Sequence, residues 1–299
     1  MILAPLAVAA LVTTPAASPA VVVNPDWELK PSGDQLADAY PPIAQFFEIN
    51  GRATVSCRVD AKGMLFDCSV VAASPPDLGF GQAALSLTDQ FLMRPKTVNG
   101  QPVESGTVRI PINFTVPKED HEDHDFTPPQ VAKTITAQHR AVVTQFGERL
   151  LDPLLAGELD MKLRRELPLI TPGVPPATIL KAREAFMAAY DIITPKMKAR
   201  ALEHVAQNYP EQELADVIRF FDTPSGQTFL QNFSRMDDYA KSADPASLEA
   251  LAVELNLFFQ SPAGLSFANL TNDLAHLATP YQHQVEVDAR RRFCEGRAC

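Results

Sequence analysis

The chain has 299 residues, of which 46% are hydrophobic and 21% are charged, and its formal net charge is −10. This length exceeds what one hydrophobic core usually organises, so we expect two domains. The negative net charge argues against nucleic-acid binding, because that affinity rests largely on clustered Lys and Arg side chains.

Residues 1–20 have the pattern of a secretory signal peptide. They read MILAPLAVAALVTTPAASPA, an apolar run followed by small residues, although no Lys or Arg precedes the run. The apolar stretch 2–12 is shorter than the roughly 20 residues that a transmembrane helix needs. We therefore predict an exported, periplasmic protein that has no transmembrane anchor after signal cleavage. A buried N-terminal helix or a disordered tail is the alternative.

The four cysteines form two pairs that are close in sequence, which is typical of compartments where disulfides persist. Cys57 and Cys68 lie in two strand-patterned runs around the turn 60–63. A loop at 61–64 would place them directly across from each other, and we predict a disulfide between them rather than two buried free thiols. Cys294 and Cys299 either close a small terminal ring or remain free or intermolecular thiols.

After a lead-in segment, 21–39, residues 40–117 alternate strand and helix patterns in the manner of a small mixed domain. We predict a helix at 42–49, a hairpin of strands 51–59 and 64–72, a helix at 80–91 and a strand at 107–116. On the last strand one face carries Val108, Ile110, Ile112 and Phe114. Pro111 within this strand demands an edge position or a bulge, because proline has no amide donor for the ladder.

This region resembles the C-terminal domain of the TonB energy-transducer family. The resemblance rests on the order Tyr40-Pro41, Gly51-Arg52, CRVDAKGMLFDC, GFGQAALSL, Met93-Arg94-Pro95 and VRIPINFTV, and is closest to alphaproteobacterial forms with paired hairpin cysteines. It implies an α+β fold, with a sheet of about three strands packed on two helices. It also implies that the domain grips an extended segment of an outer-membrane receptor by strand addition.

Val108, Ile110, Ile112 and Phe114 are the peptide-binding edge that we predict from this resemblance. A sheet edge that is blunted by Pro111 and serves only the fold is the alternative. A working transducer of the family would need an N-terminal membrane anchor and a long Pro-rich spacer. The sequence shows neither, so we do not expect energy coupling to the inner membrane.

Residues 118–128, KEDHEDHDFTP, are predicted to be a solvated linker, because such a composition cannot bury enough apolar area to fold alone. His121, Glu122, Asp123 and His124 carry nitrogen and oxygen atoms that could coordinate a divalent metal ion. A flexible run has no surrounding groups to orient the imidazoles, so we expect no metal site, with weak metal binding as the alternative. We expect no cofactor.

Residues 129–299 are predicted to form an all-α domain, because their apolar residues follow the helical period. The predicted helices are 130–151, 154–166, 176–193, 195–208, 211–221, 224–234, 245–259, 262–278 and 281–293.

Two stretches of this domain, ELADVIRFFDTPSGQTFLQNF and ALAVELNLFFQSPAGLSFANL, nearly repeat each other. The matched motif residues are Phe220, Phe221, Pro224 and Gly226 in the first copy and Phe258, Phe259, Pro262 and Gly264 in the second. Each copy predicts a helix, a tight corner with a Thr or Ser N-cap, and a second helix. We expect the Phe pairs to fill the core between the helices, with an aromatic ligand pocket as the alternative.

Residues 176–270 resemble an uncharacterised family of bacterial exported helical proteins. The resemblance rests on an acidic helix that ends in Phe-Phe before Thr-Pro-Ser-Gly, and on the looser second copy of this motif. It implies export, a helical fold and a role in protein interaction or as a scaffold. That family carries no established chemistry, so the resemblance implies no reaction.

The sequence contains no Gly-x-Ser-x-Gly elbow, His-Glu-x-x-His motif, phosphate-binding loop or zinc-finger cysteine set. His204 lies beside Glu203, and His276 lies three residues after Asp273, but such pairs are more often surface ion pairs than catalytic groups. We predict a non-catalytic cell-envelope protein related to TonB-type transport systems. Its expected partners are envelope proteins, including outer-membrane receptors or extended peptides. The alternatives are an enzyme with a site assembled from distant segments, and a structural oligomer.

Overall fold

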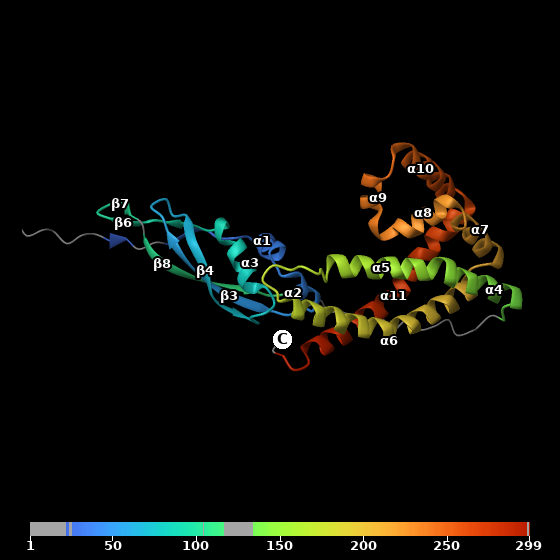
Figure 1. Cartoon of the computed structure of the whole chain (residues 1–299), viewed down its shortest axis with the longest axis horizontal. Coiled ribbons are helices and arrows are strands. Elements are labelled where there is room, and N and C mark those ends of the chain that lie inside the picture. Colours follow the sequence, from blue (N-terminus) through green and yellow to red (C-terminus); the bar gives the residue numbers. More distant parts are fainter. Residues whose placement is uncertain (1–21, 24–25, 104, 117–133, 298) are drawn as a thin grey trace, which may run out of the picture.

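The computed structural model describes residues 22–23, 26–103, 105–116, 134–297 and 299. The predicted signal peptide at 1–20 and the predicted linker at 118–128, with its histidines, lie outside the described residues. A sheet-containing part and a helical part lie end to end along the longest axis of the molecule (Figure 1).

The first part is built on a three-stranded antiparallel sheet in the order β4-β3-β8. Its strands are β3 (Gly51–Val59), β4 (Leu65–Ser74) and β8 (Ser105–Phe114). The inward residues of β3 pack against α2 (Pro42–Phe46) and α3 (Phe80–Ser86) in one core. The predicted α+β class and the predicted order of sheet part and helical part are confirmed.

Shorter elements that were not predicted from the sequence surround this sheet. The segment predicted as a lead-in forms α1 (Gly33–Asp38) and β2 (Asp26–Leu29), and β2 pairs with β5 (Leu92–Arg94). A second small sheet contains β1 (Val22–Val23), β6 (Lys96–Val98) and β7 (Gln101–Val103). Strands this short carry too little alternation to be recognised from sequence.

The β3–β4 hairpin is closed by a disulfide between Cys57 and Cys68, whose Cα atoms are 4.1 Å apart. Val59 pairs with Leu65, so the loop is one residue longer than the predicted loop at 61–64. That register alone would place Cys57 opposite Asp67. The strand pairing shifts by one residue at Asp67, which has a φ of 51°, and this bulge brings Cys68 opposite Cys57.

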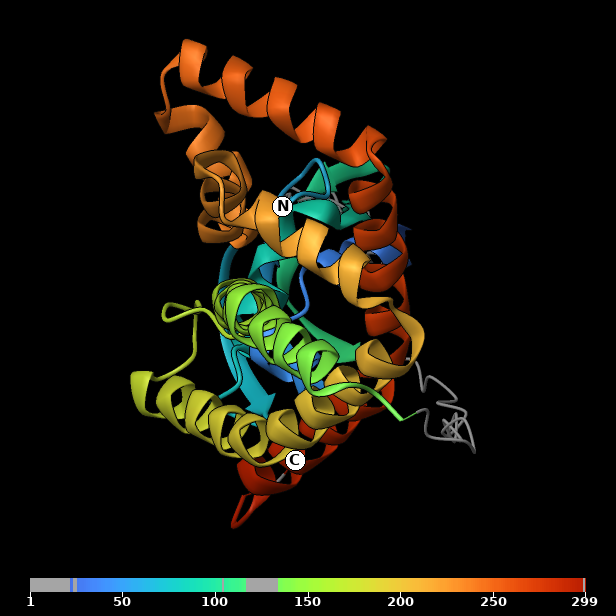
Figure 2. The ribbon, with the colours of Figure 1, turned by 90° about the vertical axis from the view of Figure 1, so that its right-hand side faces the viewer.

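The helical part begins with α4 (Ala137–Phe146), which continues through the π-helical turn η2 (Gly147–Leu151) into α5 (Asp152–Arg165). The elements that follow are α6 (Pro176–Asn208), α7 (Glu211–Phe221), α8 (Pro224–Asn232), η3 (Phe233–Arg235), α9 (Met236–Ser242), α10 (Pro245–Gln260) and α11 (Pro262–Cys294). α6 and α11 run side by side from the sheet to the far end of the molecule (Figure 1). α8 packs against α5, and Figure 2 shows α9 and α10 on the side of the helical part that lies away from α6.

α6 and α11 each continue through a proline at which the sequence predicted a break between two helices. Pro195 lies inside α6 and Pro280 inside α11, although a proline in a helix interior removes a main-chain hydrogen bond. The residues that flank the prolines are buried: Ile193, Met197, Leu277 and Val285. Burial of apolar side chains on both sides of each proline outweighs the lost hydrogen bond, so each helix runs on.

Two hydrophobic cores divide the molecule, and their boundary falls within α6 and α11. The first core joins the sheet to residues 179–193 of α6 and 285–293 of α11. The second joins α4, α7, α8 and α10 to the remaining halves of the two long helices. Where the parts meet, the Phe293 ring stacks on the Phe47 ring with their centroids 4.4 Å apart. Two domains with separate cores were expected from the sequence, but the sheet shares its core with the helices.

Candidate functional site

β8 lies at an edge of the three-stranded sheet, and its register with β3 is unbroken from Thr107 to Phe114. Pro111 lies opposite Thr54 in this ladder. Because proline has no N–H, this must be a non-hydrogen-bonded pair, in which the main-chain groups of Pro111 point away from β3. The direction of these groups alternates along a strand. The N–H and C=O groups of Arg109 and Asn113 therefore also face the open edge.

The predicted peptide-binding residues occupy the other set of positions on β8. Ile110, Ile112 and Phe114 are buried in the core, and Val108 is partly buried against it. Their main-chain groups point towards β3, so a partner strand would meet Thr107, Arg109 and Asn113 instead. The position of Pro111 in the sequence already indicates which residues face the open edge. Residues that are an even number of positions from a proline in an edge strand point their main-chain groups in the same direction as that proline.

The outer face of the sheet, on the side opposite the core, carries exposed arginines. Arg52 and Arg58 project from β3 and Arg109 from β8, whereas the only carboxylate on the three strands is Asp67, at the bulge of β4. The Arg58 guanidinium lies over the Phe66 ring, 4.8 Å from its centroid. Among the residues that the structure describes, neither Arg52 nor Arg109 forms an ion pair.

β4 forms the opposite edge of this sheet and is less regular. Its register with β3 shifts twice, and Asp67 at one shift has a positive φ. Bulges of this kind twist an edge strand and hinder the pairing of another strand. β8 is therefore the better candidate for strand addition.

Residues 37–116 match the family model of the Gram-negative bacterial TonB protein C-terminal. The match includes the three-stranded sheet, α2, α3 and the β8 edge, and it indicates a TonB-related protein of the cell envelope that interacts with partners. No curated protein and no solved structure matches the chain. Among the described residues, no helix is both long and apolar enough to cross a membrane.

The residues that follow α11 contact this TonB-like domain through an ion pair. Cys294 and Cys299 form a disulfide, and the ring that it closes contains Arg297. The Arg297 guanidinium pairs with the Asp77 carboxylate and lies 4.3 Å from the centroid of the Phe293 ring. The terminal ring therefore positions a cation that joins the end of α11 to a loop of the domain.

The two repeat copies in the helical part have matching corners. Thr223 accepts a hydrogen bond from the Gly226 amide at 3.2 Å, and Ser261 accepts one from the Gly264 amide at 3.1 Å. Pro224 and Pro262 begin the helices that follow. A Cβ atom on either glycine would overlap the last turn of the preceding helix, so a side chain at these positions would force the corner open.

Equivalent phenylalanines of the two copies meet each other. The rings of Phe220 and Phe258 stack with centroids 3.7 Å apart, and Phe221 and Phe258 are buried, whereas Phe259 is 37% exposed. Phe220, Phe221 and Phe258 therefore contribute to the second core, whereas Phe259 lies outside it. Beside the stacked pair, an open groove of about 590 Å³ between α7 and α10 is lined partly by Leu257.

Among the described residues, the cluster that most resembles an acid–base pair lies between α6 and α11. His204 Nε2 lies 3.3 Å from Asp273 Oδ2, and the Tyr209 hydroxyl donates to the same oxygen at 2.7 Å. The hydrogen bonds from Tyr209 and His204 hold the pKa of Asp273 below its usual range. Neither His204 nor Asp273 lines the groove or the small cavity of about 30 Å³ between α5, α6 and α11. The cluster therefore links two helices, away from both hollows.

Proposed function

We propose that this chain is a non-catalytic periplasmic protein that holds an extended segment of a partner by strand addition to β8. The observation that carries the proposal is the open edge of β8 within the region that matches the TonB C-terminal model. A row of unpaired main-chain groups is a template for a further strand. Extended segments of outer-membrane receptors are the partners that we propose.

The geometry of β8 favours a reversible complex. Arg109 and Asn113 offer N–H donors to the edge, whereas Pro111 between them offers only its carbonyl oxygen. Each main-chain hydrogen bond contributes about 0.5–1.5 kcal/mol net. A short added strand that lacks one of these hydrogen bonds is therefore expected to bind with moderate affinity and to dissociate readily.

The shared core supports the role of the helical part as a scaffold. The sheet packs against the ends of α6 and α11 through the stacked Phe47 and Phe293 rings. A partner bound at β8 is thereby attached to a long helical body rather than to a domain on a loose tether. The helices would then place the TonB-like domain relative to other envelope proteins.

Substitution of Asn113 by proline tests strand addition. Its N–H faces the open edge, so Asn113→Pro removes an edge donor and keeps the ladder to β3, and Asn113→Ala is the matched control. The immobilised full chain is incubated with solubilised outer-membrane proteins. We expect proteins that are retained by the wild type and by Asn113→Ala to be lost with Asn113→Pro. Equal retention by all three would exclude strand addition at β8.

Self-association through α10 is a second candidate function, favoured by the apolar side chains that this helix exposes. Val253 is 52% exposed and Leu257 is 64% exposed, and they lie one turn apart. An exposed apolar surface of this kind is typical of an interaction site. If copies of the chain associate through it, sedimentation will show an oligomer that Leu257→Asp converts to a monomer. A monomeric wild type would exclude this candidate.

A further inference from the structure

The residues that offer main-chain groups to the β8 edge also carry the side chains of the outer face. Arg109 combines both features, because its N–H and C=O groups face the edge and its side chain is exposed. In an added strand, the residue directly opposite Arg109 would project its side chain onto the same face. Its Cβ atom would lie about 5 Å from that of Arg109, within reach of a direct charge interaction.

The sheet itself provides little negative charge near Arg109. Its neighbour on β3 is Ser56, and Arg58 and Arg52 lie about 7 Å and about 13 Å along that strand. Asp67 lies two strands away and two residues along β4 from Ser69, the residue opposite Ser56, so it is about 12 Å from Arg109, beyond the screening length of about 10 Å at 0.1 M salt. The edge therefore presents a local positive potential on a chain with a net charge of −10.

We propose that the segment added to β8 carries an Asp or Glu directly opposite Arg109, and that this pair fixes the register of the added strand. The inference rests on the strand addition proposed above. Main-chain hydrogen bonds recur at every second residue, so they leave the register of a short segment weakly specified. A single pair of opposite charges distinguishes one register from the next.

Three capped peptides of alternating Thr and Val test the inference. They differ only in one central residue on the Thr face, which is Glu, Gln or Lys. Fluorescence anisotropy measures their binding to the full chain with both disulfides formed. We expect the Glu peptide to bind about two- to five-fold more tightly than the Gln peptide and the Lys peptide to bind most weakly. The differences should disappear at about 1 M salt, where screening acts within 3 Å.

Two variants identify the arginine that is responsible. Arg109→Glu should reverse the order, so that the Lys peptide binds most tightly. Arg52→Gln removes a charge from the same face about 13 Å away, and it should leave the order unchanged. An order that survives Arg109→Glu would overturn the inference.

The remaining outcomes separate this inference from the proposed function. If the three peptides bind equally and Asn113→Pro abolishes binding, strand addition stands and the acidic requirement is wrong. If no peptide binds, or if Asn113→Pro changes nothing, strand addition itself fails. If vesicles with phosphatidylglycerol bind the wild type but not Arg109→Glu, and the peptides show no order, the arginines recognise lipid headgroups and the inference is overturned.

Discussion

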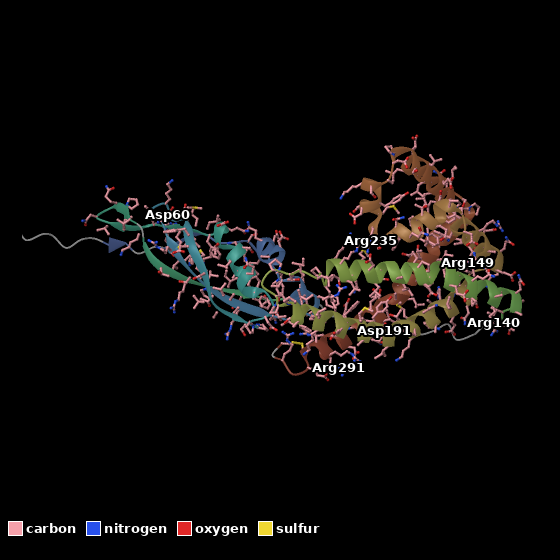
Figure 3. The ribbon with its side chains drawn as sticks, viewed as in Figure 1. Asp60, Arg140, Arg149, Asp191, Arg235 and Arg291 are labelled. Carbon is pink, nitrogen blue, oxygen red and sulfur yellow. A yellow bond between two sulfur atoms is a disulfide. The ribbon has the colours of Figure 1, made fainter. Side chains whose placement is uncertain are left out.

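At the scale of single residues, Asp160 of α5 links this helix to the segment between α8 and α9. Its carboxylate accepts hydrogen bonds from Arg164 at 3.0 Å, from Arg235 at 2.9 and 3.0 Å, and from Ser234 at 3.2 Å. These contacts tie α5 to η3, and Figure 3 shows Arg235 on the segment that leads into α9. The hydrogen bond from Arg235 is the main reason why the pKa of Asp160 is lowered to about 2.

Asp160→Asn should destabilise the chain in a way that depends on pH. A carboxylate with a lowered pKa in the folded state stabilises it above its ordinary pKa of 3.8, and this contribution is lost as the pH falls towards about 2. Because the side chain is 31% exposed, screening limits the effect to about 1 kcal/mol at pH 7. Urea unfolding should show this difference at pH 7 and none near pH 2. Asp191→Asn, which alters an exposed residue of α6 (Figure 3), should show no such loss at pH 7.

Gly226→Ala should destabilise the second core by about 1–3 kcal/mol, since the new Cβ overlaps the backbone of Phe220 and Phe221. Gly157→Ala is the matched control. Its new Cβ meets the nearest atom, on Phe233, at 3.5 Å, so the gain in helix propensity should raise stability by about 0.5–1 kcal/mol. Thermal unfolding distinguishes the two variants, and equal effects would contradict the close packing at the repeat corner.

At the scale of elements, the alternation of β3 and β8 and the capped corners of the repeat could be predicted from sequence, because their signals lie within a few residues. The bulge at Asp67 could not be predicted, since the turn and the disulfide impose different registers and only the folded hairpin reconciles them. The breaks predicted at Pro195 and Pro280 were wrong because packing between α6 and α11 overrides the local preference. The outward direction of Arg109 and Asn113 was implied by Pro111 and was missed.

The double variant Cys57→Ala, Cys68→Ala should lower the free energy of unfolding by about 2–3 kcal/mol, because the unfolded chain loses a constraint. Chemical denaturation measures the change. Cys294→Ala with Cys299→Ala should cost less, since that disulfide spans a sequence separation of 5 rather than 11. A hairpin variant that is as stable as the oxidised wild type would contradict the role of the disulfide as a staple.

At the scale of the whole molecule, the sheet and the long helices form one body. Sequence patterns show which residues are apolar but not which distant faces meet, so the contact between Phe47 and Phe293 could not be predicted. Arg290 adds a hydrogen bond to Glu48 at 2.9 Å across the same junction. Motion of the TonB-like domain relative to the helices would therefore require separation of a continuous core.

Phe293→Ala should destabilise both parts together by about 3–5 kcal/mol, because it removes a fully buried ring from the shared core. The only tryptophan, Trp27, reports on the sheet part by fluorescence, and circular dichroism reports on the helices. Both transitions should move to lower denaturant concentrations. Phe259→Ala removes a ring that is 37% exposed and lies beside Phe258 and Phe267 of the other core, and it should leave the Trp27 transition nearly unchanged. An unchanged Trp27 transition in Phe293→Ala would contradict the shared core.

The most direct test of strand addition is a filtered nuclear Overhauser experiment on the isotope-labelled chain with the unlabelled Glu peptide bound. We predict contacts between peptide backbone protons and those of Arg109 and Asn113, with the Glu side chain near Arg109. Contacts confined to β4, or to the groove between α7 and α10, would contradict the account.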